Sequence, residues 1–110
     1  MRSDQERLED ILEAIEKIER YIPRGIQAFE ADEMLQVWVV RHLHIIGKAA
    51  SRVTVETQNR FPGIPWGKMI GMRHVLVHGY FEIDLDIVWS VIENDIGPLK
   101  EQIQAAIQNL

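Results

Sequence analysis

Apolar residues recur along one helix face over the first fifth of the chain. They follow the i, i+3, i+4, i+7 rule and are Leu8, Ile11, Leu12, Ile15, Ile18 and Ile22. This pattern predicts an amphipathic helix over about residues 4–22, with Ser3 or Asp4 as its N-cap. A Pro and a Gly mark the end of this helix, and we expect Phe29 to plug the short linker that follows.

A second helix is predicted to begin near Asp32 and to run to Val53. Apolar residues keep helical spacing over this stretch for more than five turns. Residues 61–67 (FPGIPWG) then hold two prolines and two glycines, a composition that favours a turn-rich loop. This loop separates the long central helix from the rest of the chain.

A third, shorter helix is predicted over about Trp66–His78, ending at Gly79. Asp84 is a good N-cap for a last helix, which Gly97-Pro98 should kink or split. There is no internal repeat and no domain linker, so we expect one domain over residues 1–110. The predicted fold class is all-α, an antiparallel bundle of four to five helices joined by short loops.

Composition narrows the function classes. The absence of cysteine excludes disulfide frameworks, thiolate nucleophiles and Cys-based zinc sites. The sequence has no signal-peptide core and no run of about 20 apolar residues, so we expect a soluble, cytoplasmic protein without a membrane partner. Twelve Lys and Arg against seventeen Asp and Glu give a net charge of −5. Any contact with nucleic acid must therefore be made by a local basic site on an acidic protein.

Polar chemistry is concentrated in GMRHVLVHGY, residues 71–80, which holds Arg73, His74, His78 and Tyr80. An imidazole can take a proton from a ribose 2′-OH or give one to a leaving 5′-oxygen, and a guanidinium can clamp the phosphate oxygens. Arg73 and His78 therefore suit phosphodiester cleavage without a metal. On a regular helix they would lie about 140° apart, so either Arg73 reaches across or a second subunit completes the site.

Alternatives to catalysis stay open for these residues. Arg73 could pair with a surface carboxylate, while His78 interacts with the dipole at a helix end. A zinc site is a second alternative, because His74 and His78 are four apart and would share a helix face. It lacks the Glu of the metalloprotease motif and an evident third ligand. His42 and His44 are two apart, and we interpret both as structural, with at most one facing the core.

Tyr80 also admits two interpretations. It could simply pack over a helix end, as an aromatic ring with a polar tip can. Alternatively, an exposed phenol beside the Arg/His pair could touch substrate or be chemically capped, which would bring bulk and negative charge into a site built for phosphate.

The sequence resembles the HepT-like branch of the HEPN superfamily, whose members are the toxins of HepT/MntA toxin–antitoxin systems. The resemblance covers nearly the whole chain. The matching stretches are ILEAIEKIERY (11–21), DEMLQ (32–36), RHLHIIGKAA (41–50), IPW (64–66), GMRHVLVHGYFEID (71–84) and Asn94-Asp95 with Pro98. The most specific is the Arg-x4-His-x-Tyr signature, which Arg73, His78 and Tyr80 match in full.

The resemblance implies a metal-independent endoribonuclease with RNA as its substrate and no cofactor. It also implies a homodimer in which two Arg-x4-His motifs meet in a cleft at the dimer interface. This homodimer could stand alone or form part of a larger hetero-oligomer. Arg73 and His78 would be catalytic and His74 would help to bind phosphate. An MntA-like minimal nucleotidyltransferase would neutralise the toxin by transferring AMP to Tyr80.

Two positions depart from the family's usual pattern: His74, where Asn is common, and Lys48, where Glu is common. A rival hypothesis from another class is a non-catalytic helical adaptor that binds nucleotide or a nucleotidyltransferase partner. In that case the Arg/His pair would recognise phosphate without cleaving it.

Overall fold

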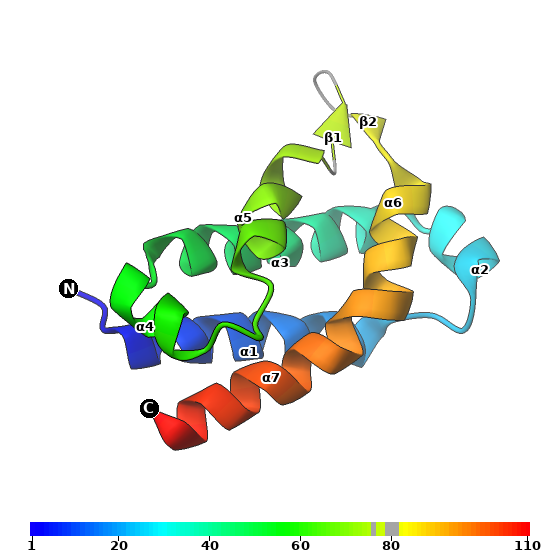
Figure 1. Ribbon diagram of the computed structural model, residues 1–110. Coiled ribbons are helices and arrows are strands. Elements are labelled where there is room, and N and C mark those ends of the chain that lie inside the picture. The colour runs from blue at the N-terminus through cyan, green and yellow to red at the C-terminus, as the bar shows by residue number, and fades with distance from the viewer. Residues whose placement is uncertain (76, 79–81) are drawn as a thin grey trace.

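Helices account for most of the fold in the computed structural model, which describes residues 1–75, 77–78 and 82–110 (Figure 1). The long helical segments are α1 (Asp4–Tyr21), α3 (Glu33–Arg52), α5 (Trp66–Val75) and a continuous rod made of α6 (Leu85–Ser90), η1 (Val91–Asp95) and α7 (Ile96–Asn109). Two short helices, α2 (Ile26–Glu30) and α4 (Val55–Arg60), lie between them, and β1 (Val77–His78) pairs with β2 (Glu82–Ile83). The predicted all-α bundle is confirmed.

The core forms where α1 and α3 run side by side in opposite directions and where α5 and α7 pack against them (Figure 1). Its fully buried side chains come from the apolar faces that the sequence pattern marks: Leu8, Ile11, Ile15, Ile18, Val39, Leu43, Ile46, Met69, Ile96 and Ile103. Burying each such side chain contributes about 1.5–3 kcal/mol, which offsets the entropy lost on folding.

Three N-caps are present, and two of them, Ser3 and Asp84, were predicted. Ser3 forms a capping box with Glu6, whose backbone N–H donates to the Ser3 Oγ over 3.1 Å. Asp32 caps α3 by accepting from the backbone N–H of Leu35 at 3.0 Å. Asp84 caps α6 in the same way by accepting from the backbone N–H of Ile87 at 3.1 Å. Each cap satisfies donors that the first helical turn leaves unpaired.

The predicted extent of the third helix was wrong. α5 ends at Val75 rather than at His78, and Val77–His78 form a strand paired antiparallel with Glu82–Ile83. The β-branched Val77 favours the extended backbone that this strand requires. The predicted helix end at Gly79 lies outside the described residues.

The two linkers are more ordered than expected. Phe29 is completely buried, as predicted, but it lies on the short helix α2. The buried Gln36 amide donates to the Phe29 and Glu30 carbonyls at 2.9 and 3.0 Å, which fixes the end of that helix. Helices of five or six residues are too short for a periodic signal, so neither α2 nor α4 was predicted.

The expected kink in the last helix takes the form of a π-helical turn. η1 precedes Pro98, and the Ile96 N–H bonds to the carbonyl of Val91, five residues back. Proline cannot donate a hydrogen bond, and its ring clashes with the carbonyl four residues earlier in a regular α-helix. A wider turn accommodates this clash, so the rod continues without splitting.

No helix in the described ranges is long and apolar enough to cross a membrane.

Candidate functional site at the end of helix α5

The signature residues lie where a helix gives way to a hairpin. Arg73 and His74 belong to the last turn of α5, and His78 is the last residue of β1, in register with Glu82 on β2. Tyr80 lies outside the described residues. Figure 1 shows that this hairpin joins the top of α5 to the top of α6, away from the α1–α3 pair.

The backbone corrects one premise of the sequence reasoning. Arg73 and His78 do not lie on one helix, so the 140° separation expected on a regular helix does not apply. The same holds for His74 and His78, which lie on a helix and a strand rather than on one helix face. The zinc alternative therefore loses the geometry on which it was based. Among the described residues, no three His, Asp or Glu side chains gather where they could hold a metal ion.

α5 is held rigidly at the end opposite the hairpin. The Trp66 indole N–H donates to the Phe61 carbonyl at 3.0 Å, which ties the start of the helix to the Pro/Gly-rich loop. Met69 and Met72 are buried on the face of α5 that packs against α3. Because these anchors fix the axis of α5, they also fix where its last turn presents Arg73.

A cleft of about 390 Å³ lies between α5 and the rod that starts with α6. Its lining on the α5 side is Lys68 and Met72, the residue just before Arg73, and on the other side it includes Asp86 and Asp95. The ammonium of Lys68 lies 3.1 Å from the Asp95 carboxylate, so these two lining residues form an ion pair across the cleft. Of the hollows in the described part of the chain, this cleft is the one next to the signature in sequence.

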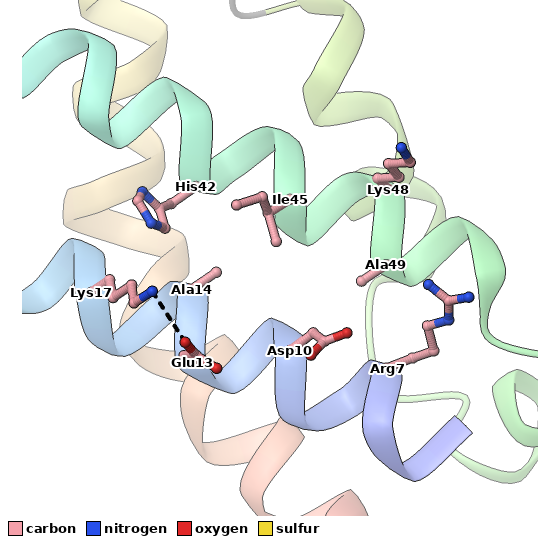
Figure 2. A pocket seen from close by; sticks show the side chains of 9 residues that line it. All are labelled: Arg7, Asp10, Glu13, Ala14, Lys17, His42, Ile45, Lys48 and Ala49. Atoms are coloured by element: carbon pink, nitrogen blue, oxygen red, sulfur yellow. Dashed lines mark ion pairs between the residues drawn. The ribbon is translucent and has the colours of Figure 1, made fainter. Parts of the chain in front are cut away.

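A second, more polar groove of about 240 Å³ lies between α1 and α3, away from the signature (Figure 2). Its carboxylates are already paired. The Asp10 carboxylate accepts from Arg2, and the Glu13 carboxylate lies 3.1 Å from the Lys17 ammonium. The groove's other two cations, Arg7 and Lys48, form no ion pair with a carboxylate that the structure describes.

His42 lines this groove although it is only 3% exposed. Its Nδ1 lies 2.8 Å from the Trp38 carbonyl, so that nitrogen carries the proton. Its ring packs on the Trp38 indole with centroids 4.3 Å apart. His44, two residues further, is only half-buried. The prediction that at most one of these two histidines faces the core is confirmed.

Sequence reasoning missed the cations that α3 exposes, Arg41 and Arg52, and a charge count would have found them. Residues 34–81 hold one of the seventeen carboxylates, Glu56, but six of the twelve Lys and Arg and all four His. That stretch therefore has a formal charge of +5, and the rest of the chain has −10. Acidic and basic residues are segregated along the chain, which the net charge of −5 conceals.

Comparison with known proteins gives a consistent result. The family model described as "Ribonuclease HepT-like" matches residues 11–106. A protein of Thermococcus cleftensis named "Probable ribonuclease HepT" is 38% identical over 94% of this chain and 94% of its own length. A "Putative RNase" of Methanocaldococcus jannaschii is 31% identical over 88% and 90%, and one of Caldanaerobacter subterraneus is 33% identical over 98% and 97%. No solved structure matches significantly.

Proposed function

Since the chain belongs to the HepT-like ribonuclease family, we propose that it is a metal-independent endoribonuclease in which Arg73 and His78 act on the scissile phosphodiester. The observation that carries this proposal is the complete Arg-x4-His-x-Tyr signature within a family match that spans residues 11–106. The position of the signature, at the end of a helix anchored by buried methionines, supports it. Catalytic groups work best when a rigid element holds them.

The proposed reaction is an internal transesterification. The His78 imidazole takes the proton of the ribose 2′-OH, the 2′-oxygen bonds to phosphorus, and the bond to the 5′-oxygen breaks. That leaving oxygen receives a proton from the imidazolium of a second His78 or from water. The Arg73 guanidinium stabilises the charge that builds on the phosphate oxygens, and His74 assists phosphate binding. The products are a 2′,3′-cyclic phosphate and a 5′-hydroxyl.

A homodimer would supply the second His78. Two large apolar side chains on the outer face of α3 support such an assembly, since Met34 is 85% exposed and Val37 is 56% exposed. They lie three residues apart, so they form one apolar strip on adjacent turns. Exposed apolar side chains that lie together are suited to burial in a contact with a second subunit.

We further propose that the protein is the toxin of a toxin–antitoxin pair in the cytoplasm. Its partner would be an MntA-like minimal nucleotidyltransferase, which transfers AMP from ATP to the Tyr80 hydroxyl and releases pyrophosphate. The adduct would place a bulky, negatively charged group two residues from His78 and block RNA from the site.

The proposed chemistry is tested by analysing RNA fragment ends after cleavage by the wild type, His78→Ala and Arg73→Lys. We expect a 2′,3′-cyclic phosphate from the wild type, no cleavage by His78→Ala, and a large loss with Arg73→Lys, because lysine keeps the charge but loses the bidentate fork. Arg24→Lys, on an exposed residue of the α1–α2 turn, is the matched control and should cleave normally. A primary 3′-hydroxyl product would contradict the mechanism. Folded, unmodified protein that cuts no RNA would favour the adaptor hypothesis.

A further inference from the structure

We infer that α3 carries a phosphate-binding surface for single-stranded RNA, formed by Arg41, Lys48 and Arg52 and called the basic face below. This inference rests on the proposed ribonuclease function and assigns residues to substrate binding outside the Arg-x4-His-x-Tyr signature. It starts from the charge segregation along the chain, because residues 34–55 contain no carboxylate at all.

The three cations share one side of the helix. Arg41 and Lys48 are seven residues apart, and Lys48 and Arg52 are four apart, which are spacings that bring side chains to the same helix face. At about 1.5 Å of rise per residue, the basic face extends along roughly 16 Å of α3. All three residues are exposed, while the opposite side of α3 is buried against α1.

The cations of the basic face lack acidic partners in the described part of the chain, a property they share with Arg7, Arg20, Arg24 and Arg60. Within the described part of the chain, none of the three forms an ion pair, whereas Lys17, Lys68 and Lys100 lie within 2.9–3.1 Å of carboxylates. Unneutralised cations side by side repel one another, and an anion that binds all of them relieves that repulsion. Figure 2 shows the Lys48 side chain extending away from α1.

The surface between the cations has the shape to receive a strand. A shallow hollow of about 440 Å³ follows this side of α3; its Val37 end borders the apolar strip assigned above to the dimer, and the rest of its described lining is Val40, Arg41, His44, Ile45 and Lys48. It combines a basic edge with aliphatic side chains on which a nucleobase or ribose can rest.

RNA is the occupant that the neighbouring elements favour. α5, which carries Arg73 and His74, packs directly on α3, so the basic face and the signature belong to one layer of the bundle. Figure 1 shows α5 crossing α3 and rising to the hairpin. The acidic residues are concentrated on α1 and on the segment after residue 81, so a polyanion is attracted to this layer and repelled by the others.

The test is RNA affinity measured as a function of salt, by fluorescence anisotropy with a labelled 2′-O-methyl oligoribonucleotide that cannot be cleaved. The variant is Arg41→Gln/Lys48→Gln. The matched control is Arg20→Gln/Arg24→Gln, which removes two exposed cations outside the layer. This control has the same net charge as the α3 variant. Each phosphate contact on a single strand contributes about 0.7 to the log–log salt slope, so losing two lowers the slope by about 1.4 and the affinity about 25-fold near 0.1 M salt.

Each result decides the matter. A slope and affinity loss of that size in the α3 variant, with the control within about twofold of wild type, supports the basic face. Equal RNA binding by both variants, while wild type still cleaves RNA, overturns the basic face and leaves the ribonuclease proposal intact. An α3 variant that changes its oligomeric state but not its RNA affinity makes this side of α3 a subunit interface instead. Wild-type protein that neither binds nor cleaves RNA overturns both proposals. Far-UV circular dichroism of both variants verifies folding.

Discussion

Replacing Asp4 by alanine should destabilise the protein well beyond the usual effect of losing a surface carboxylate. Asp4 is the first residue of α1, and its carboxylate ties that helix to the start of α4, about fifty residues later. It accepts the Thr54 backbone N–H at 3.1 Å and the hydroxyls of Thr54 and Thr57 at 2.6 Å each. The alanine variant leaves the buried Thr57 hydroxyl without this acceptor.

The magnitude follows from the number of bonds and their exposure. A hydrogen bond to a charged group contributes about 1.5–3 kcal/mol when it is buried, but Asp4 is only half-buried, so water replaces part of each bond. At about 0.5–1 kcal/mol for each of the three bonds, the expected loss is about 2 kcal/mol. For a domain of this size that loss lowers Tm by roughly 10 °C.

Urea and thermal unfolding followed by circular dichroism measure this loss. Glu33→Ala is the matched control, because Glu33 is the first residue of α3 and is exposed. It shares the helix-dipole effect but lacks hydrogen bonds like those from Thr54 and Thr57 to Asp4, which are called the clasp below. A double-mutant cycle with Thr57→Val should show a coupling of about 1 kcal/mol. If Asp4→Ala costs no more than Glu33→Ala, or if the cycle shows no coupling, the clasp does not stabilise the fold.

The clasp also predicts a pH dependence. Burial raises the pKa of Asp4, but the hydrogen bonds from Thr54 and Thr57 outweigh it, so the pKa lies below its ordinary value of 3.8. The ionised form is therefore favoured by folding, and its stabilisation is complete above the unfolded pKa and lost as pH falls through the folded one. The difference in stability between wild type and Asp4→Asn should shrink below about pH 4. A difference that grew on acidification would have the wrong sign.

Two further predictions concern the core and the signature. Phe29→Ala should cost about 3–5 kcal/mol in urea unfolding, because the ring is fully buried and packs 5.6 Å from the Trp89 ring, and a cost under about 1 kcal/mol would show that α2 is dispensable. Tyr80→Phe should abolish AMP transfer by a cognate nucleotidyltransferase, followed by intact mass, while RNA cleavage persists; transfer to the Phe variant would place the acceptor elsewhere.

The sequence was sufficient to predict the long helices, because their apolar faces repeat over many turns. Ser3 and Asp84 could be predicted as caps because a short polar side chain before an apolar run has one common structural use. Phe29 could be predicted as buried, although its helix could not.

The site was harder to predict, for a local reason. Residues 75–77 (VLV) form a short continuous apolar run, which fits a buried helix as well as a buried strand, so periodicity alone could not find the end of α5. Pairing with Glu82–Ile83 decides the matter, and that pairing is a tertiary contact. The basic face escaped notice for another reason, since net charge averages over positions that the fold separates into layers.

The central claim is that His78 performs metal-free RNA cleavage. The most direct measurement is cleavage of a broad RNA panel by purified wild type and by His78→Ala, with and without EDTA, after intact mass has excluded an AMP adduct. The account predicts that wild type cleaves equally well with EDTA and that His78→Ala, folded by circular dichroism, does not cleave. Cleavage that EDTA abolishes, or that persists undiminished in His78→Ala, would contradict it.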